Sequence, residues 1–376
     1  MPSITISGMA RVAGLSAGLT FSAGLALATG TALAADATMR MTTTWTSGIN
    51  LMEGDKKFVE IANAITGDAL KIEFFEGGTL VPPTQVFDAV QSNTVQASAD
   101  WPGYWAGKNS AFGLLGSYPM LFTAADYILW TKQWGGFEAF QEAYGQFGMV
   151  YLPYAVVSME SGLRGRKPIP TLAEMDGKRI RMSGRAQGEI LKRLGAAQTQ
   201  IAGGEVYQAL ERGVVDAAEF SGPGVDWGMG LQEVSKYWMT PGWHQPGSMS
   251  GVMINKKFWD GLPEEVQAKL KIAADATLSW SIAYYEHDAV EAVRKFKEAG
   301  TEVVQLPAED VAKLQEISNQ ALVDEACANP LFAKIAASQV EYMADYAEWR
   351  GMAGDFAMGR NLSKLPDVAK LKSCAG

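Results

Sequence analysis

Two hydrophobic periods alternate along most of the chain. Short runs rich in β-branched and aromatic residues are separated by stretches in which apolar residues recur every three or four positions. The short runs that we predict to be strands are residues 39–44, 70–75, 178–182, 214–220 and 251–254. This alternation predicts an α/β fold, with helices layered on sheets of largely parallel strands.

A helix–turn–strand unit recurs after 120 residues, at 85–97 and again at 205–217. The apolar positions of the two copies coincide at Val86/Val206, Phe87/Tyr207, Ala89/Ala209, Val90/Leu210, Val95/Val215 and Ala97/Ala217. Each predicted helix ends at Asn93 or Gly213, residue types that tolerate a left-handed C-cap. Chance similarity is the alternative. A true repeat predicts two similar lobes that meet at a cleft, because α/β sheets bind ligands at the carboxyl ends of their strands.

One helical stretch is unusually long, from Pro263 to Gly300. Proline favours the start of a helix and glycine favours its end. The 38 residues of this stretch would span roughly 57 Å at 1.5 Å per residue, so the helix either crosses both lobes or breaks into two. Two shorter helices are expected at 308–327 and 329–351.

The first residues indicate the compartment. A small-residue apolar run at 12–33, with Arg11 as the only charge before it, ends in Ala32-Leu33-Ala34, a pattern that signal peptidase cleaves. An ordinary buried N-terminal helix is the alternative, but the run has no polar face. No later segment has the roughly 18 uninterrupted apolar residues of a membrane-spanning helix. We therefore expect an exported, periplasmic protein whose mature chain starts near Ala35.

A mature chain on the order of 340 residues is longer than one typical core, and this favours two domains. The expected organisation is a signal peptide at 1–34, a first lobe at 35–160 and 247–280, a second lobe with the C-terminal helices at 161–246 and 281–360, and a tail at 361–376.

Charge and cysteine content narrow the function further. The formal net charge is -9, and it becomes -10 without Arg11, so a nucleic-acid or anionic-lipid partner is disfavoured. Cys327 and Cys374 suit one disulfide in an oxidising compartment or two unpaired thiols.

Residues typical of catalysis are few. The chain has two histidines, His244 and His287, and it lacks a two-histidine metal motif, a G-x-S-x-G elbow, a P-loop and a dinucleotide fingerprint. We therefore expect a binding protein and not an enzyme. An exported enzyme that acts on a small carboxylic acid is the alternative, because scattered Asp and Glu pairs do not exclude it.

Aromatic and polar residues concentrate where the predicted lobes would meet. Those proposed to line a ligand pocket are Trp101, Tyr104, Trp105, Phe220, Trp243 and Gln245. Aromatic side chains wall a pocket while a few polar groups orient the ligand, although ordinary core packing is the alternative for each of them. For an acidic ligand the expected partner is Arg181, whose planar fork matches a carboxylate and which lies near the end of a predicted strand. A surface role is the alternative for this arginine.

Several motifs together resemble the substrate-binding subunits of TRAP (tripartite ATP-independent periplasmic) transporters, over nearly the whole mature chain. They are FDAVQ from Phe87, YWAGK from Tyr104, GKRIR from Gly177, GGEVYQALERGVVDAAE from Gly203, PGWHQPG from Pro241 and NKKFWDGLP from Asn255. The motifs are most similar to the branch that binds 2-oxo acids and related hydroxy or sugar acids.

The resemblance implies a two-lobed binding-protein fold whose cleft closes on the ligand and whose long helix bridges the lobes. It implies that Arg181 pairs with the ligand carboxylate and that Glu219 and Phe220 are the acid–aromatic pair of the site. It also implies sodium-coupled delivery of the acid to transporter membrane subunits by a receptor that does not itself span the membrane. A monomer and a dimer are both open.

In the oxo-acid branch, Na⁺ or Ca²⁺ is held by a glutamine, by the backbone carbonyl of that aromatic residue and by a glutamate in Pro-Gly-Trp-His-x-Pro. Position x is Gln245 here, so a cation is uncertain. One hypothesis is that Glu160 takes the place of the glutamine, which gives Glu160, Phe220 and Gln245 as cation ligands. The alternative, which we favour slightly, is that Arg164 reaches the cleft as a second positive group and no cation is needed.

Overall fold

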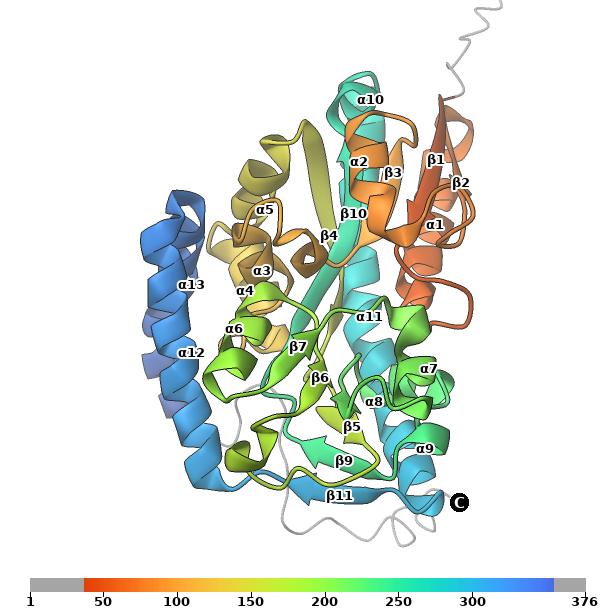
Figure 1. Ribbon diagram of the computed structural model, residues 1–376. Helices are drawn as coiled ribbons and strands as arrows, with labels where there is room; N and C mark the ends of the chain where they lie inside the picture. Colours follow the sequence, from red (N-terminus) through yellow and green to blue (C-terminus); the bar gives the residue numbers. More distant parts are fainter. Residues whose placement is uncertain (1–36, 355–376) are drawn as a thin grey trace, which may run out of the picture. The chain divides into compact units, whose positions relative to one another are not determined.

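Two β-sheets with helices packed on them make up the part of the chain that the computed structural model describes, residues 37–354 (Figure 1). The first sheet has the strand order β2-β1-β3-β10-β4, and the second has the order β11-β9-β5-β8-β6-β7. The mixed α/β fold with two lobes is therefore confirmed.

Both sheets contain parallel and antiparallel strand pairs. The first sheet consists of β1 (Ala37–Thr43), β2 (Leu70–Phe74), β3 (Ala97–Asp100), β4 (Met149–Val157) and β10 (Ser248–Asn255). The second consists of β5 (Leu163–Gly165), β6 (Arg179–Arg181), β7 (Ala197–Thr199), β8 (Ala217–Ala218), β9 (Tyr237–Thr240) and β11 (Glu302–Gln305). The prediction of parallel strands holds for β1 with β2 and β3, and for β6 with β7 and β8. It is wrong for β10 and β5, which run antiparallel to both of their neighbours, because each of them follows directly on a strand of the other sheet.

Helices separate the strands, as the sequence predicts. The α-helices are α1 (Met52–Thr66), α2 (Val86–Gln91), α3 (Ala111–Gly116), α4 (Ala124–Gln133), α5 (Gly136–Gly145), α6 (Arg185–Arg193), α7 (Val206–Glu211), α8 (Pro223–Gly228), α9 (Leu231–Val234), α10 (Lys256–Asp260), α11 (Glu264–Glu298), α12 (Ala308–Ala328) and α13 (Pro330–Ala353). Short 3₁₀ helices are η1 (Gly67–Ala69), η2 (Pro83–Gln85), η3 (Pro102–Trp105), η4 (Leu172–Met175) and η5 (Gly203–Glu205).

The two segments at an offset of 120 residues have the same local backbone conformation. Asn93 and Gly213 both adopt left-handed conformations, with φ of 58° and 68°. The amide of Thr94 donates to the carbonyl of Ala89 at 2.8 Å, and the equivalent bond from Val214 in the second copy is 2.9 Å. Each copy then enters a strand, β3 or β8, whose carboxyl end faces the region between the sheets.

The long helix α11 is unbroken over 35 residues and runs beside both sheets (Figure 1). It packs against α1 and β4 of the first lobe and against α8 of the second. The Tyr285 hydroxyl donates to the Leu51 carbonyl at 2.9 Å, and the Phe296 ring packs on Trp238 of the second sheet. Of the two possibilities left open by the sequence, the single helix that crosses both lobes is therefore confirmed.

Two further segments connect the sheets, 158–162 between β4 and β5, and 241–247 between β9 and β10. They lie side by side, because the amide of Glu160 donates to the carbonyl of Gln245 at 3.1 Å. A Cβ at Gly242 would collide with the Glu160 carbonyl, so only glycine allows this close approach. These two connections hold Glu160 and Gln245 between the lobes.

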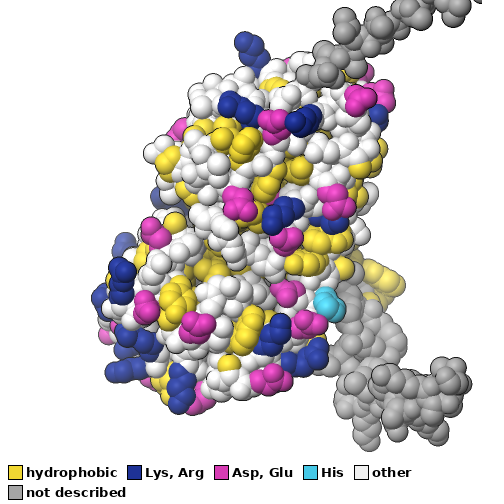
Figure 2. All heavy atoms as spheres, turned by 90° about the vertical axis from the view of Figure 1, so that its right-hand side faces the viewer, with side chains coloured by type: hydrophobic (Ala, Val, Ile, Leu, Met, Phe, Trp, Pro, Cys, Tyr) yellow, Lys and Arg dark blue, Asp and Glu magenta, His cyan; other side chains and the backbone are white. Residues whose placement is uncertain are grey.

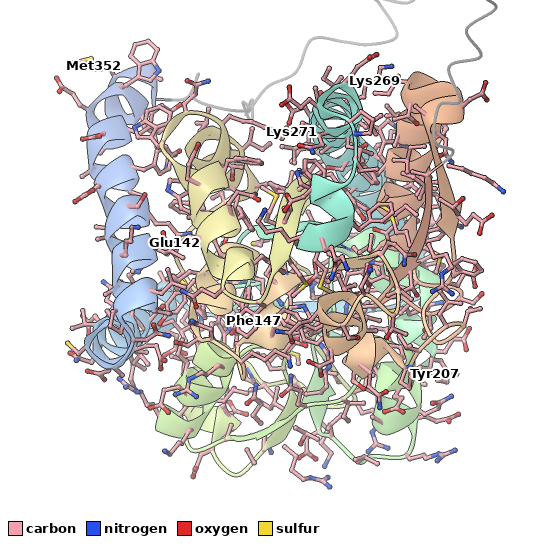
Figure 3. All side chains as sticks on the ribbon, turned by 90° about the horizontal axis from the view of Figure 1, so that it is seen from above. Glu142, Phe147, Tyr207, Lys269, Lys271 and Met352 are labelled. Atoms are coloured by element: carbon pink, nitrogen blue, oxygen red, sulfur yellow. The ribbon has the colours of Figure 1, made fainter. Side chains whose placement is uncertain are left out.

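The C-terminal helices divide between the lobes. Helix α12 packs against α6, whereas α13 packs against α3, α4 and α5. Glu142 of α5, labelled in Figure 3, accepts from Lys334 of α13 at 2.7 Å. This packing of α13 differs from our expectation that both helices belong to the second lobe. Helical periodicity identifies an apolar face but not the surface that covers it, and the other lobe boundaries stay predictions.

Several predictions lie outside the described residues. They concern the signal peptide at 1–34, the tail at 361–376 and Cys374, so a pairing of Cys374 with the exposed Cys327 stays untested. Within residues 37–354, no helix is long and apolar enough to cross a membrane. Acidic and basic side chains are interspersed over the face drawn in Figure 2.

Candidate functional site

The carboxyl ends of β6 and β8 bring an arginine and a glutamate together. Arg181, the last residue of β6, pairs in register with Ala218, the last residue of β8, and Glu219 follows directly. Arg181 Nη1 lies 2.7 Å from Glu219 Oε1, and both side chains are buried. The strand ends therefore fix a buried ion pair at the edge of the second sheet that faces the first.

Arg181 uses most of its donors within the protein. Nη1 donates to the backbone carbonyl and to the carboxylate of Glu219, while Nε and Nη2 both donate to the carbonyl of Ile201. One of the five guanidinium hydrogens, on Nη2, is therefore left over. A ligand carboxylate bound in bidentate geometry needs two donors. Nη2 can supply the second donor by giving up its bond to the Ile201 carbonyl, because that carbonyl keeps its bond from Nε.

A second buried acid faces this pair. Glu160 Oε2 lies 3.0 Å from His244 Nε2, which is 3.9 Å from Glu219 Oε2. Burial, followed by the charge of Glu219, raises the pKa of Glu160 well above its usual range. Burial lowers the pKa of His244 to about 4, so this imidazole is neutral near pH 7. Glu219 Oε2 and His244 Nδ1 have no hydrogen-bond partner among the described residues.

A small cavity of about 20 Å³, here called the ligand cavity, lies between the sheets beside this cluster. Its lining residues are Trp45, Leu51, Trp101, Tyr104, Val157, Glu160, Ser183, Phe220, Ser221, Gln245, Ser248 and Ser250. Five of them were singled out from the sequence: Trp101, Tyr104, Glu160, Phe220 and Gln245. Arg181 does not line the cavity itself, but its guanidinium lies 5.4 Å from the centre of the Phe220 ring.

Three of the predicted residues lie elsewhere. The indole of Trp105 donates to Asp100 and packs in the core of the first lobe. Trp243 is buried in the core of the second lobe. The guanidinium of Arg164 is sandwiched 3.9 Å from each of the rings of Trp238 and Phe296. The structure therefore does not bring these three side chains to the cavity, because aromatic and cationic residues near a strand end also serve as core.

Seven residues of the cavity wall were not predicted from the sequence. They are Ser183, Ser221, Ser248, Ser250, Trp45, Leu51 and Val157. Single serines carry no recognisable pattern in sequence. Ser183 was detectable in principle, because it follows the strand end that carries Arg181.

The lining residues are compatible with a hard cation. Glu160, Phe220 and Gln245 all line one cavity, and oxygen donors such as a carboxylate, a backbone carbonyl and an amide oxygen suit Na⁺ or Ca²⁺. A related set, Glu160, Glu219 and His244, has ligand atoms within 4.8 Å of one another. If all the acids are ionised, Glu160, Glu219 and Asp226 outnumber Arg164 and Arg181 by one negative charge.

Comparison with known proteins identifies the family of this chain. The family described as bacterial extracellular solute-binding protein, family 7, matches residues 41–328. A monocarboxylate 2-oxoacid-binding periplasmic protein of Nostoc sp. is 31% identical over 79% of this chain and 81% of its own length. A C4-dicarboxylate-binding periplasmic protein of Rhodobacter capsulatus is 27% identical over 70% of this chain and 79% of its own.

Solved structures agree with the fold. A TRAP transporter solute-binding protein of Bordetella bronchiseptica, with calcium and picolinate bound, has a TM-score of 0.81 at 29% identity, covering 84% of this chain and 94% of its own. One from Pseudoalteromonas atlantica, with sodium and pyruvate bound, has a TM-score of 0.80 at 26% identity, covering 85% and 97%. Because the family match covers most of the chain, the protein belongs to the bacterial extracellular solute-binding proteins of family 7, the solute receptors of TRAP transporters.

Proposed function

We propose that this protein captures a small monocarboxylate of the 2-oxo acid class in the periplasm and delivers it to the membrane subunits of a TRAP transporter. The observation that carries the proposal is the buried Arg181, which keeps one Nη2 hydrogen beside a small cavity walled by Tyr104 and Phe220. The 2-oxoacid-binding Nostoc relative and the pyruvate-bound Pseudoalteromonas structure support the same ligand class.

The charged residues near the cavity favour a ligand with a single carboxylate. None of the described lysines and arginines lines the ligand cavity itself. Arg181 lies next to its wall, 5.4 Å from the centre of the Phe220 ring, whereas Arg164 is held by Asp226 at 3.0 Å between two aromatic rings. A second ligand carboxylate would meet Glu160 and the serines, and an unpaired buried charge is strongly unfavourable. A monocarboxylate with a small apolar tail matches the lining of Trp45, Leu51 and Val157.

A cation bound together with the ligand would complete the charge balance. Glu160, Gln245 and the Phe220 carbonyl would hold it, and it would supply positive charge between the ligand oxygens and the two glutamates. The position of Arg164 favours this hypothesis over the metal-free alternative. The exchange of glutamine and glutamate between positions 160 and 245 would keep the total charge of the ligand set.

Calorimetry on the ion-stripped protein tests the proposal. We expect pyruvate to bind in the presence of Na⁺ or Ca²⁺ and to be recovered unchanged. Removing both ions should weaken binding at least about tenfold, and Glu160→Gln should reproduce that loss with the ion present. Gln245→Glu, which restores the acid of the relatives, is the matched control and should keep cation-dependent binding. Equal affinity with and without ions would contradict the cation, and failure of every 2-oxo acid to bind would contradict the ligand class.

A further inference from the structure

The ligand cavity lies next to a much larger space. A groove of about 710 Å³, here called the α6 groove, is lined by Gly103 and Gly107 of the first lobe and by Arg185, Glu189 and Lys192 of α6, among others. Among the described residues, Tyr104 is the only one that lines both the α6 groove and the ligand cavity. One aromatic side chain thus borders both a small cavity and a much larger space.

Aromatic neighbours hold Tyr104 in place between the ligand cavity and the α6 groove. Its ring packs edge-on against Trp101 at 5.1 Å and Trp45 at 5.8 Å, and this packing fixes its orientation on the first lobe. From the second lobe, Ser183 lines the ligand cavity and its neighbour Gly184 lines the groove. Gly184 has a φ of 97°, and a Cβ there would collide with the Gln187 side chain, so glycine is required at this position.

From this geometry we propose that Tyr104 sets the upper limit on ligand length by closing the ligand cavity off from the α6 groove. The proposal rests on the proposed function, since it concerns the acid that Arg181 holds. With Tyr104 in place, an acid longer than the cavity has nowhere to extend. Without the ring, the tail would pass between Gly103 and Gly184 into the groove. Exclusion of one surplus methylene from an apolar pocket is worth about 10- to 200-fold in discrimination.

The chain offers a matched control at the same position. Tyr104→Phe keeps the ring and removes only the hydroxyl, so it distinguishes the effect of the ring's bulk from that of a hydrogen bond made by the hydroxyl.

The test is calorimetry of the full chain, with Ca²⁺ present, against straight-chain 2-oxo acids of three to six carbons. For the wild type we expect each carbon beyond the fourth to weaken binding at least about tenfold. Tyr104→Ala should shrink the ratio of dissociation constants between the six-carbon and three-carbon acids at least about tenfold, whereas Tyr104→Phe should leave it within about threefold.

Two results would overturn the inference. One is an unchanged length profile in Tyr104→Ala that still binds pyruvate. The other is a wild type that binds the six-carbon acid as well as pyruvate. If Tyr104→Ala is misfolded by circular dichroism, Tyr104→Leu takes its place, with the same expected direction and the same overturning result. A wild type that binds none of these acids instead overturns the proposed function, and the length limit with it.

Discussion

The two lobes bury carboxylates in different ways. In the first lobe, Asp55 accepts from Thr43 at 2.7 Å and Tyr154 at 2.5 Å, and Asp100 accepts from Tyr144 at 2.9 Å. No cation contacts either acid among the described residues, and burial raises the pKa of each to about 7. In the second lobe, Glu219 and Asp226 each pair with a buried arginine.

This difference indicates that the two lobes have separate roles in ligand binding. Only neutral groups donate to Asp55 and Asp100, so neither acid is paired with a buried cation that could attract an anion. The second lobe carries two buried guanidinium groups, of which Arg181 is next to the cavity wall. We infer that the second lobe recognises the carboxylate, while the first supplies the aromatic wall that Trp101 and Tyr104 form.

The largest expected effect is the loss of that recognition. Arg181→Ala should abolish pyruvate binding, because removing one partner of a buried charge pair costs about 2–5 kcal/mol or more and leaves Glu219 unpaired beside Glu160. Arg181→Lys should fail as well, since a point charge does not replace the planar fork. Calorimetry measures both.

Arg179→Ala is the matched control for Arg181. Arg179 lies on the same strand, but it is exposed and pairs with Asp216 at 3.2 Å. We expect its affinity to equal that of the wild type. Near wild-type affinity in Arg181→Ala would remove this arginine from the site and end the assignment of anion recognition to the second lobe.

The next effect concerns stability and not binding. Arg164→Ala should lower the free energy of unfolding by about 3–5 kcal/mol, because it leaves Asp226 buried without its cation. The double variant Arg164→Met/Asp226→Leu should recover most of this loss. Chemical denaturation measures both, and the folded fraction of Arg164→Ala should still bind pyruvate. A loss of affinity without a loss of stability would instead make Arg164 a ligand-binding cation.

The pH dependence of stability should show a smaller difference between the lobes. The folded-state pKa of Asp55 and Asp100, about 7, is above the ordinary 3.8, so their contribution is full at low pH and is lost as pH rises through 7. Each adds at most about 1.4 kcal/mol per pH unit. The neutral His244 has the opposite effect: as the pH falls below its ordinary pKa of 6.5, it lowers the stability of the folded state. We expect the melting temperature to rise from pH 8 to pH 6.5.

Asp100→Asn should flatten that rise, because an amide oxygen still accepts from Tyr144 but does not titrate. The melting curves can be recorded at half-unit intervals of pH without ligand. An equal slope in the variant and the wild type would show that Asp100 is ionised in the folded first lobe, against the contrast between the lobes.

The smallest expected effect is at the exposed ion pairs of the second lobe. Arg193 of α6 pairs with Asp324 of α12 at 2.7 Å near the surface. Exposed pairs contribute about 0–1 kcal/mol, so Arg193→Ala should change the free energy of unfolding by less than about 1 kcal/mol. A loss as large as that of Arg164→Ala would mean that burial does not decide the value of a charge pair here.

Local sequence patterns determined the elements and the repeat. Helix α11 followed from apolar spacing between Pro263 and Gly300, and the turns at Asn93 and Gly213 followed from residues that tolerate a positive φ. The strand end that carries Arg181 was also visible, because it depends on neighbours in the chain. Local patterns recur at fixed intervals, and for this reason they can be recognised without tertiary contacts.

Only the tertiary structure decided which of the candidate side chains share a cavity. Trp101 and Trp105 lie four residues apart, yet the first lines the ligand cavity and the second is bound to Asp100 in the core. Arg164 and Glu160 are equally close in sequence, yet the arginine is held between Trp238 and Phe296. The direction of a side chain near a strand end depends on partners that are distant in sequence. The sequence therefore determined the elements and the chemistry available at their ends, and long-range packing determined which of those groups face the ligand.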